Sequence, residues 1–172
     1  FSLVTSGRGA SRQEVLALAR RIAAIRDEVE IKVCGSFGIL GREDLAILQA
    51  AGMDRYHHNL ESSREFFPTI CTTHSFADRI ATIQAAHSLG ISVCSGGIIG
   101  LGESEADRIS LAATLAQLEV DSVPLNFLIP LPGTPLADIK PLDMAEILRA
   151  IALFRLHLPA VPLRLAAGRE SA

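Results

Sequence analysis

Short apolar runs alternate with amphipathic helical patterns along the chain. Six runs are apolar or β-branched and have the length of strands, and they cover residues 1–5, 30–35, 54–60, 91–97, 121–129 and 161–168. Helices are predicted after Ser11 and over residues 41–52, 75–90, 104–118 and 142–158. Strands separated by helices pair in parallel through crossover connections, so the pattern predicts an α/β fold.

Capping residues mark the ends of several of these helices. Ser11 can cap the first helix, and Glu14 lies three residues later, as in a capping box. Gly52 and Gly90 follow their helices at positions where a left-handed C-cap is expected. These signals support the helix boundaries independently of the hydrophobic periodicity.

Polar and ligand-type residues gather at or just after the ends of the predicted strands. They are Cys34, His57 to Asn59, Cys94, Asn126 and Arg164. A closed barrel brings all strand ends to one mouth, whereas an open doubly wound sheet gathers residues only at a switch point. We therefore expect one domain over residues 1–172, a partial (β/α) TIM-type barrel with about six of the eight βα units.

The composition limits the class of protein. Apolar residues make up 49% of the chain, charged residues 20%, and the net charge is −3, as in a soluble globular protein. Basic residues are scattered through the predicted helices, so we expect no nucleic-acid partner. The apolar runs are shorter than the roughly 18 residues of a membrane span. Three cysteines, an odd number, favour a reducing compartment, and we expect the cytoplasm.

Cys34 and Cys94 lie near the ends of two predicted strands. In a barrel both thiols can point inward, and clustered thiolates bind soft metals or iron–sulfur clusters. Spacing alone gives a weak signal, because the chain holds no CxxC or CxxxCxxC motif. The alternative is that each cysteine is a small buried apolar residue.

The stretch "YHHNLES" (56–62) places polar residues where a strand would normally continue apolar. Alternation puts His57, Asn59 and Glu61 on one face and His58 on the other. The amide and the carboxylate could bind a pair of hydroxyls such as those of a ribose, and the alternative is a solvated strand end. A zinc or iron hydrolase that uses His57, His58 and His74 is disfavoured, because adjacent strand residues point to opposite faces.

Two further strands carry a polar residue in an apolar setting. Asn126 must either bond the backbone or bind a ligand, since a buried unpaired polar group costs about 1–3 kcal/mol. Arg164 is expected to be buried, and it then needs a core carboxylate or an anionic ligand as partner. In "GGIIGLGE" (96–103), the glycines allow a flat ligand to approach, with backbone amides and carbonyls free to bond an adenine edge. The run matches neither a dinucleotide fingerprint nor a P-loop.

Taken together, "YHHNLE", "TTHSFADRIATIQAAHSLGISVCSGGIIGLGE", "DSVPLNFLIPLPGTPLAD" and "RLAAGRE" resemble the biotin synthases, a family of radical S-adenosylmethionine enzymes. The resemblance runs through the whole chain in order. It implies a homodimeric barrel that inserts sulfur between two carbons of dethiobiotin. A 4Fe-4S cluster would cleave S-adenosylmethionine to a 5′-deoxyadenosyl radical, and an auxiliary cluster, 2Fe-2S or a variant type, would supply the sulfur.

The resemblance also implies roles for individual positions. Asn59 and Glu61 would hold the ribose of S-adenosylmethionine, Arg79 its carboxylate, and Gly96, Gly97, Ile98 and Gly100 its adenine. His57 and Asn126 would line the dethiobiotin site. Cys34, Cys94 and Arg164 would be ligands of the auxiliary cluster. Iron–sulfur assembly proteins, sulfur donors and an electron donor are the implied protein partners.

Two departures from the family affect this transfer. Ser2 stands where well-known members have a cysteine ligand, and Cys71 could supply a third thiolate in a different type of cluster, or else be a buried structural thiol. The CxxxCxxC motif of the 4Fe-4S cluster would lie before Phe1. We therefore expect an internal fragment that is inactive alone. Alternatives are another radical S-adenosylmethionine enzyme acting on a different small molecule, and a catalytically silent barrel fragment.

Overall fold

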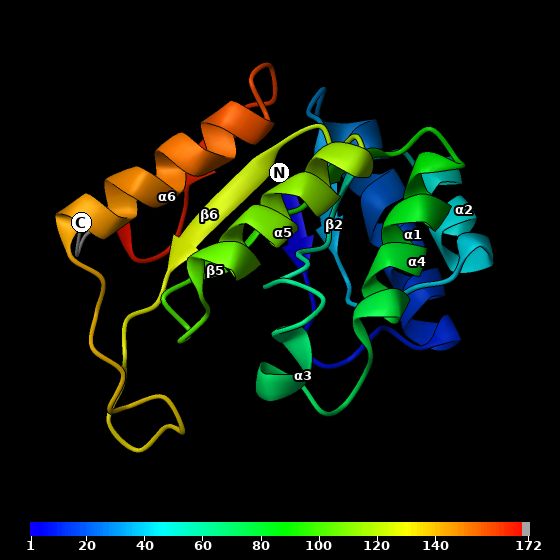
Figure 1. The fold of residues 1–172 in the computed structure, drawn as a ribbon. Helices are drawn as coiled ribbons and strands as arrows, with labels where there is room; N and C mark the ends of the chain where they lie inside the picture. Colours follow the sequence, from blue (N-terminus) through cyan, green and yellow to red (C-terminus); the bar gives the residue numbers. More distant parts are fainter. Residues whose placement is uncertain (170–172) are drawn as a thin grey trace. The chain divides into compact units, whose positions relative to one another are not determined.

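Parallel strands alternate with helices in residues 1–169, the part of the chain that the computed structural model describes (Figure 1). The strands are β1 (Ser2–Val4), β2 (Val33–Ser36), β3 (Met53–His57), β4 (Ser92–Cys94), β5 (Gly97–Ile99), β6 (Val123–Phe127) and β7 (Leu163–Leu165). The helices are α1 (Arg12–Glu28), α2 (Arg42–Ala50), α3 (Phe67–Ile70), α4 (Phe76–His87), α5 (Glu105–Gln117) and α6 (Met144–His157).

All six predicted strand regions and all five predicted helices are present, but three details differ. The predicted strand 91–97 is two strands, β4 and β5, that belong to different sheets. The predicted strand 54–60 ends at His57, so the residues after it are not part of the sheet. The short helix α3 was not predicted, because four residues around a proline carry no helical periodicity.

The described residues form two compact units. The first contains Phe1–His58 and Thr73–Cys94, and the second contains Asn59–Thr72 and the chain from Ser95 onward. The prediction of a single domain is not tested by this grouping and stays a prediction.

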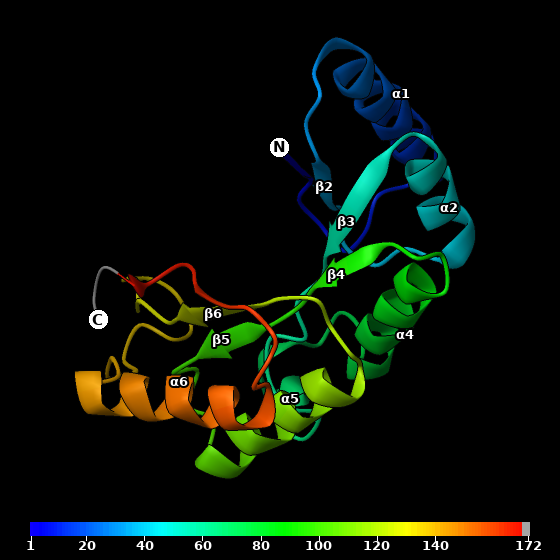
Figure 2. The same ribbon diagram turned by 90° about the horizontal axis from the view of Figure 1, so that it is seen from above.

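The first unit is a four-stranded parallel sheet in the order β1-β2-β3-β4. Helices α1, α2 and α4 lie along one face of it (Figure 2). Val33, Tyr56 and Val93 are fully buried in the strands, as are Leu45 and Ile83 in the helices. The residues that alternate with them in the strands are mostly half-buried, and these form the opposite face.

The second unit is a three-stranded parallel sheet in the order β5-β6-β7, with α5 and α6 packed together. Along β6, Val123, Leu125 and Phe127 are buried, whereas Pro124 and Asn126 are half-buried. Both sheets follow the order of the sequence and contain no switch point. This is the winding of a barrel and not that of a doubly wound sheet.

The predicted helix ends are confirmed. The Ser11 hydroxyl accepts a hydrogen bond from the Glu14 amide, and the Glu14 carboxylate accepts one from the Ser11 amide, which completes the capping box. Gly52 and Gly90 have φ values of 101° and 73°, as left-handed C-caps require. Within residues 1–169, none of the helices is both long and apolar enough to cross a bilayer.

Candidate functional site

A groove of about 290 Å³ in the second unit gathers four of the predicted site residues. Asn59, Glu61, Ile98 and Asn126 line it, together with the segment 127–129 and Ala167. These residues come from the chain after β3, from β5, from β6 and from the chain after β7. The groove therefore joins the residues predicted to bind a ribose, an adenine and a small substrate.

Asn59 and Glu61 reach this groove because the chain leaves the first sheet after His57. The Leu60 and Glu61 amides donate to the Gly96 carbonyl at 2.9 and 3.2 Å, and the Glu61 carbonyl accepts from Ile98 at 2.9 Å. Glu61 has a φ of 71°, a left-handed conformation that costs a non-glycine residue free energy and that is typical of functional sites. The predicted strand alternation of His57, Asn59 and Glu61 is therefore wrong, but Asn59 and Glu61 still line one groove.

The side chains of Asn59 and Glu61 are held in place locally. The Asn59 carbonyl oxygen accepts from the Gly96 amide at 3.2 Å, and the Asn59 amide nitrogen lies 3.5 Å from a carboxylate oxygen of Glu61. An amide carries two N–H donors, and a carboxylate has several lone pairs. The pair can therefore receive a vicinal diol while keeping these contacts.

Gly96 and Gly97 are required by the protein's own backbone. A Cβ atom at Gly96 would lie 1.9 Å from the carbonyl oxygen of Pro124, and one at Gly97 would lie 2.5 Å from that of Glu61. The Gly96 carbonyl and the Ile98 and Gly100 amides already make hydrogen bonds inside the protein. The Ile98 and Gly100 amides are therefore not free to bond an adenine edge. The glycine-rich segment 96–100 instead presents to a ligand a surface with few side chains.

Asn126 bonds the backbone on both sides of its strand. Its amide nitrogen donates to the Gly97 carbonyl at 3.2 Å, and its carbonyl oxygen accepts from the Ala167 amide at 3.1 Å. The side chain thereby links β5, β6 and the chain after β7. Since the amide has a second N–H and a second lone pair, it can also contact a ligand in the groove.

We expect Asn126→Leu to lower the free energy of unfolding by about 2 kcal/mol, because the Gly97 carbonyl and the Ala167 amide both lose their partner. Urea unfolding of the wild type and the variant measures the difference. A leucine variant as stable as the wild type would show that these two hydrogen bonds contribute nothing.

Arg79 lies in the first unit, at the start of α4. Its Nε donates to Nε2 of His74 at 3.0 Å, and Nδ1 of His74 lies 2.9 Å from the Thr73 hydroxyl. His58 is 5% exposed, and its Nε2 has no hydrogen-bond partner. Burial, and then the charges of Arg79 and His74, lower the pKa of His58 to about 3. His58 is therefore a neutral residue of the core.

Cys34 and Cys94 share one face of the first sheet. Cys34 is in register with Ser2 on one side and with Arg55 on the other, and Cys94 is in register with His57. Arg55 and His57 are two residues apart in β3, so all these side chains lie on the face opposite the helices. The Arg55 Nε donates to the Ser92 hydroxyl on that face at 3.0 Å.

The two thiols fit a bridging group better than a single ion. Strand β3 separates β2 from β4, so the two Cα atoms are at least about 10 Å apart. Among the described residues no set of three or more His, Cys, Asp or Glu could hold one metal ion. A polynuclear group such as an iron–sulfur cluster spans a larger distance and prefers thiolates.

Cys71 and Arg164 belong to the second unit. Cys71 ends α3, where its amide donates to the Phe67 carbonyl at 3.0 Å, and it is half-buried. Arg164 lies on β7, in register with Pro124 of β6, and its side chain is exposed. The prediction of a buried guanidinium is therefore wrong, because β7 is an edge strand of its sheet. The three cysteines form no disulfide within the described part of the chain.

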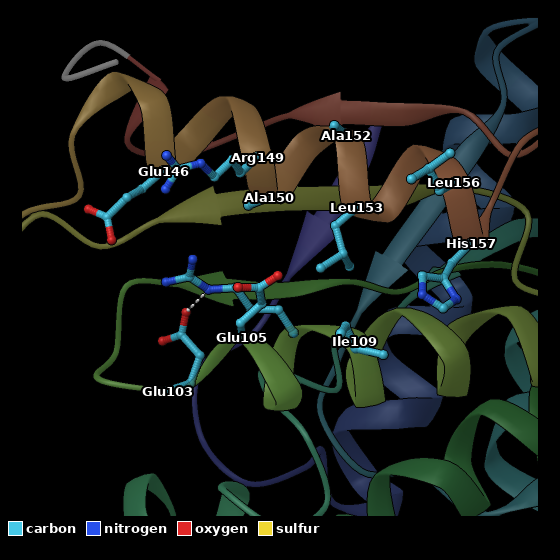
Figure 3. A pocket seen from close by; sticks show the side chains of 11 residues that line it. Glu103, Glu105, Ile109, Glu146, Arg149, Ala150, Ala152, Leu153, Leu156 and His157 are labelled. Carbon is cyan, nitrogen blue, oxygen red and sulfur yellow. Dashed lines mark hydrogen bonds and ion pairs between the residues drawn. The ribbon is translucent and has the colours of Figure 1, made fainter.

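A second hollow, of about 580 Å³, lies between α5 and α6 and contains none of the predicted residues (Figure 3). Its lining includes Glu103, whose carboxylate accepts from Nε of Arg108 at 2.7 Å. The same carboxylate accepts from the Gly100 amide, so it holds the loop after β5 against α5. Sequence reasoning missed this pair and the His74–Arg79 pair, although both have the same spacing of five residues.

Two family models match this chain. Residues 3–115 match the Radical SAM superfamily, and residues 124–172 match the Biotin and Thiamin Synthesis associated domain. A biotin synthase of Desulforudis audaxviator is 52% identical over 99% of this chain and 52% of its own length. One of Thermotoga petrophila is 48% identical over 99% of this chain and 57% of its own length. The chain thus spans about half the length of the curated relatives it matches.

Solved structures agree on the architecture. Methylornithine synthase has a TM-score of 0.79 at 19% identity and covers 88% of this chain and 45% of its own. The FeFe-hydrogenase maturase HydG from Carboxydothermus hydrogenoformans has a TM-score of 0.78 at 20% identity and covers 95% of this chain and 41% of its own. These likenesses confirm the predicted fold class, a partial TIM-type barrel of βα units.

Proposed function

The chain belongs to the radical SAM superfamily, and we propose that it functions as a biotin synthase, an enzyme that inserts sulfur into dethiobiotin to form biotin. One observation carries the proposal. Four residues that the family resemblance assigns to S-adenosylmethionine and dethiobiotin line a single groove of the second unit. About half of the residues are identical to those of biotin synthases over nearly the whole chain, which supports this choice of substrate.

In this proposal S-adenosylmethionine binds with its ribose against Glu61 and Asn59. The carboxylate accepts hydrogen bonds from the two ribose hydroxyls, and the amide orients the carboxylate. Ile98 and the adjacent glycines offer a flat apolar surface to the adenine. Arg79 binds the carboxylate of the methionyl part, since a guanidinium matches a carboxylate with two parallel hydrogen bonds.

Dethiobiotin is proposed to bind beside these residues. Asn126 offers a second N–H and a second lone pair to its ring urea, while its present hydrogen bonds fix the orientation of the amide. The family resemblance assigns His57 to the same substrate. Phe127 to Ile129 supply the apolar part of the groove, which suits an aliphatic chain.

Cys34 and Cys94 are proposed as ligands of the auxiliary cluster, with Ser2 beside Cys34 where the family has a further cysteine. The resemblance adds Cys71 and Arg164 of the second unit to the ligand set. When bound, S-adenosylmethionine with a 4Fe-4S cluster supplies the 5′-deoxyadenosyl radical, and the auxiliary cluster supplies sulfur. The residues of this chain hold the reactants in place and keep water out.

We further propose a homodimer that works with an electron donor and with iron–sulfur assembly proteins in the cytoplasm. The cytoplasm is proposed because the chain has an odd number of cysteines, three, which is unusual in an oxidising compartment.

The test is turnover by the protein expressed from its complete gene and reconstituted without oxygen with iron and sulfide. Given a reductant and S-adenosylmethionine, we expect 5′-deoxyadenosine to form faster with dethiobiotin, and biotin to appear. Mass spectrometry measures both products. Release of 5′-deoxyadenosine with no response to dethiobiotin and no biotin would point to a different substrate and refute the proposal.

A further inference from the structure

One arginine lies on the same face of the first sheet as Cys34 and Cys94. Arg55 belongs to β3, between β2 and β4, and it is in register with Cys34 on one side and with Ser92 on the other. Its Nε donates to the Ser92 hydroxyl at 3.0 Å, which turns the guanidinium toward β4. Ser92 precedes Cys94 by two residues on that strand and shares its face. The Arg55 side chain is therefore bordered by Cys34 and by the strand that carries Cys94.

No carboxylate of the four strands neutralises Arg55. Strands β1 to β4 contain one acidic residue, Asp54, and it is turned to the helices. The Asp54 carboxylate accepts from the Val33 amide at 2.8 Å and lies 3.6 Å from Arg26 of α1. Arg55 is half-buried, and it forms no ion pair with any residue that the structure describes. A partly desolvated guanidinium favours an anion beside it.

A group that joins the sulfur atoms of Cys34 and Cys94 has to cross β3. Cys34 is level with Arg55, and Cys94 is level with His57. The path between the two sulfurs therefore passes over β3 between the positions of Arg55 and His57. Thiolate ligands give an iron–sulfur cluster a net negative charge, which grows by one when an external reductant gives the cluster an electron. Arg55 thus lies where this charge would be held.

We propose that Arg55 is the counter-charge of the auxiliary cluster and that it raises the reduction potential of that cluster by stabilising the reduced, more negative form. This inference rests on the proposed function for the identity of the group that Cys34 and Cys94 bind. Ser92 acts as a positioning residue, because it holds Nε, and the described residues accept no hydrogen bond from the Nη groups. Both Nη groups can therefore donate to cluster sulfur.

The test removes the charge with Arg55→Gln, which keeps a polar side chain beside Ser92. The protein expressed from the complete gene is reconstituted with iron and sulfide without oxygen, and it is titrated with a reductant while visible absorption and electron paramagnetic resonance are recorded. The transition that Cys34→Ala abolishes belongs to the auxiliary cluster. At a fixed potential, the ratio of reduced to oxidised auxiliary cluster should fall about tenfold, a midpoint lower by about 59 mV for a one-electron couple. The 4Fe-4S cluster should keep its midpoint.

Two variants serve as controls. Arg55→Lys keeps the positive charge, so the midpoint of the auxiliary cluster should stay close to that of the wild type. Arg20→Gln removes the same charge from an exposed position of α1, which lies along the other face of the sheet (Figure 2), and it should change neither midpoint. Iron and acid-labile sulfide per polypeptide are measured for each protein. If Arg55→Gln does not fold, Arg55→Met supplies a neutral side chain of similar length, and the same shift is expected.

The outcomes separate this inference from the proposed function. Wild-type protein without any transition that Cys34→Ala abolishes overturns the proposed cluster and this inference together. Wild-type protein that shows the transition, with an unchanged midpoint in Arg55→Gln, overturns this inference alone. A midpoint as low in Arg55→Lys as in Arg55→Gln would also overturn it, because the charge would then not be the cause. Loss of the auxiliary cluster in Arg55→Gln together with its retention in Arg55→Lys would support the counter-charge.

Discussion

Cys34→Ala and Cys94→Ala are each expected to remove the auxiliary cluster from the reconstituted protein while the 4Fe-4S cluster remains. Each change deletes a thiolate from the face of the first sheet where the two cysteines lie two strands apart. Iron and acid-labile sulfide per polypeptide should fall by the content of one cluster, and biotin formation should stop. Cleavage of S-adenosylmethionine should continue.

Two further variants complete this experiment. Ser92→Ala changes a hydroxyl on the same face that bonds Arg55, and it should retain both clusters. Cys71→Ala tests the third thiolate. If it retains the auxiliary cluster while Cys34→Ala and Cys94→Ala lose it, Cys71 is not a ligand. Full cluster content in Cys34→Ala or Cys94→Ala would contradict the proposed ligand set.

Gly96→Ala is expected to destabilise the second unit by at least about 3 kcal/mol, at the upper end of overpacking effects. The added methyl group would lie 1.9 Å from the Pro124 carbonyl oxygen and 2.9 Å from its carbonyl carbon. Both are backbone atoms of β6, so relief requires separating two segments whose hydrogen bonds shape the groove. Urea unfolding and S-adenosylmethionine affinity should both report the damage.

Gly41→Ala is the matched control. A Cβ at Gly41 meets nothing within 4 Å, and Gly41 is the N-cap of α2 with a φ of −80°. Gly41→Ala should lower the free energy of unfolding by no more than about 1 kcal/mol. If Gly96→Ala proved as stable as Gly41→Ala, the close approach between Gly96 and β6 would not exist in solution.

Local sequence signals predicted most of the secondary structure. Hydrophobic periodicity and capping residues located five helices and six strand regions, because these features depend on residues within a few positions of each other. The break between β4 and β5 was not predictable in this way. It depends on the approach of Gly96 to Pro124 and of Gly97 to Glu61, contacts between residues about 28 and 36 positions apart.

The site was predicted by resemblance and only partly by chemistry. Polar residue types in apolar surroundings identified Asn59, Glu61 and Asn126, which the structure brings into one groove. The predicted strand alternation does not explain why Asn59 and Glu61 lie together, because β3 ends before Asn59. His74 was missed as a partner of Arg79, because that pairing needs the geometry of a capped helix start and not a residue type alone.

We propose that this chain works in an enzyme that moves sulfur from an auxiliary cluster into dethiobiotin. The most direct measurement reconstitutes the protein expressed from the complete gene with sulfide of a heavy sulfur isotope and analyses the product of a single turnover by mass spectrometry. We expect biotin that carries the heavy isotope. Consumption of S-adenosylmethionine and dethiobiotin without labelled biotin would contradict it.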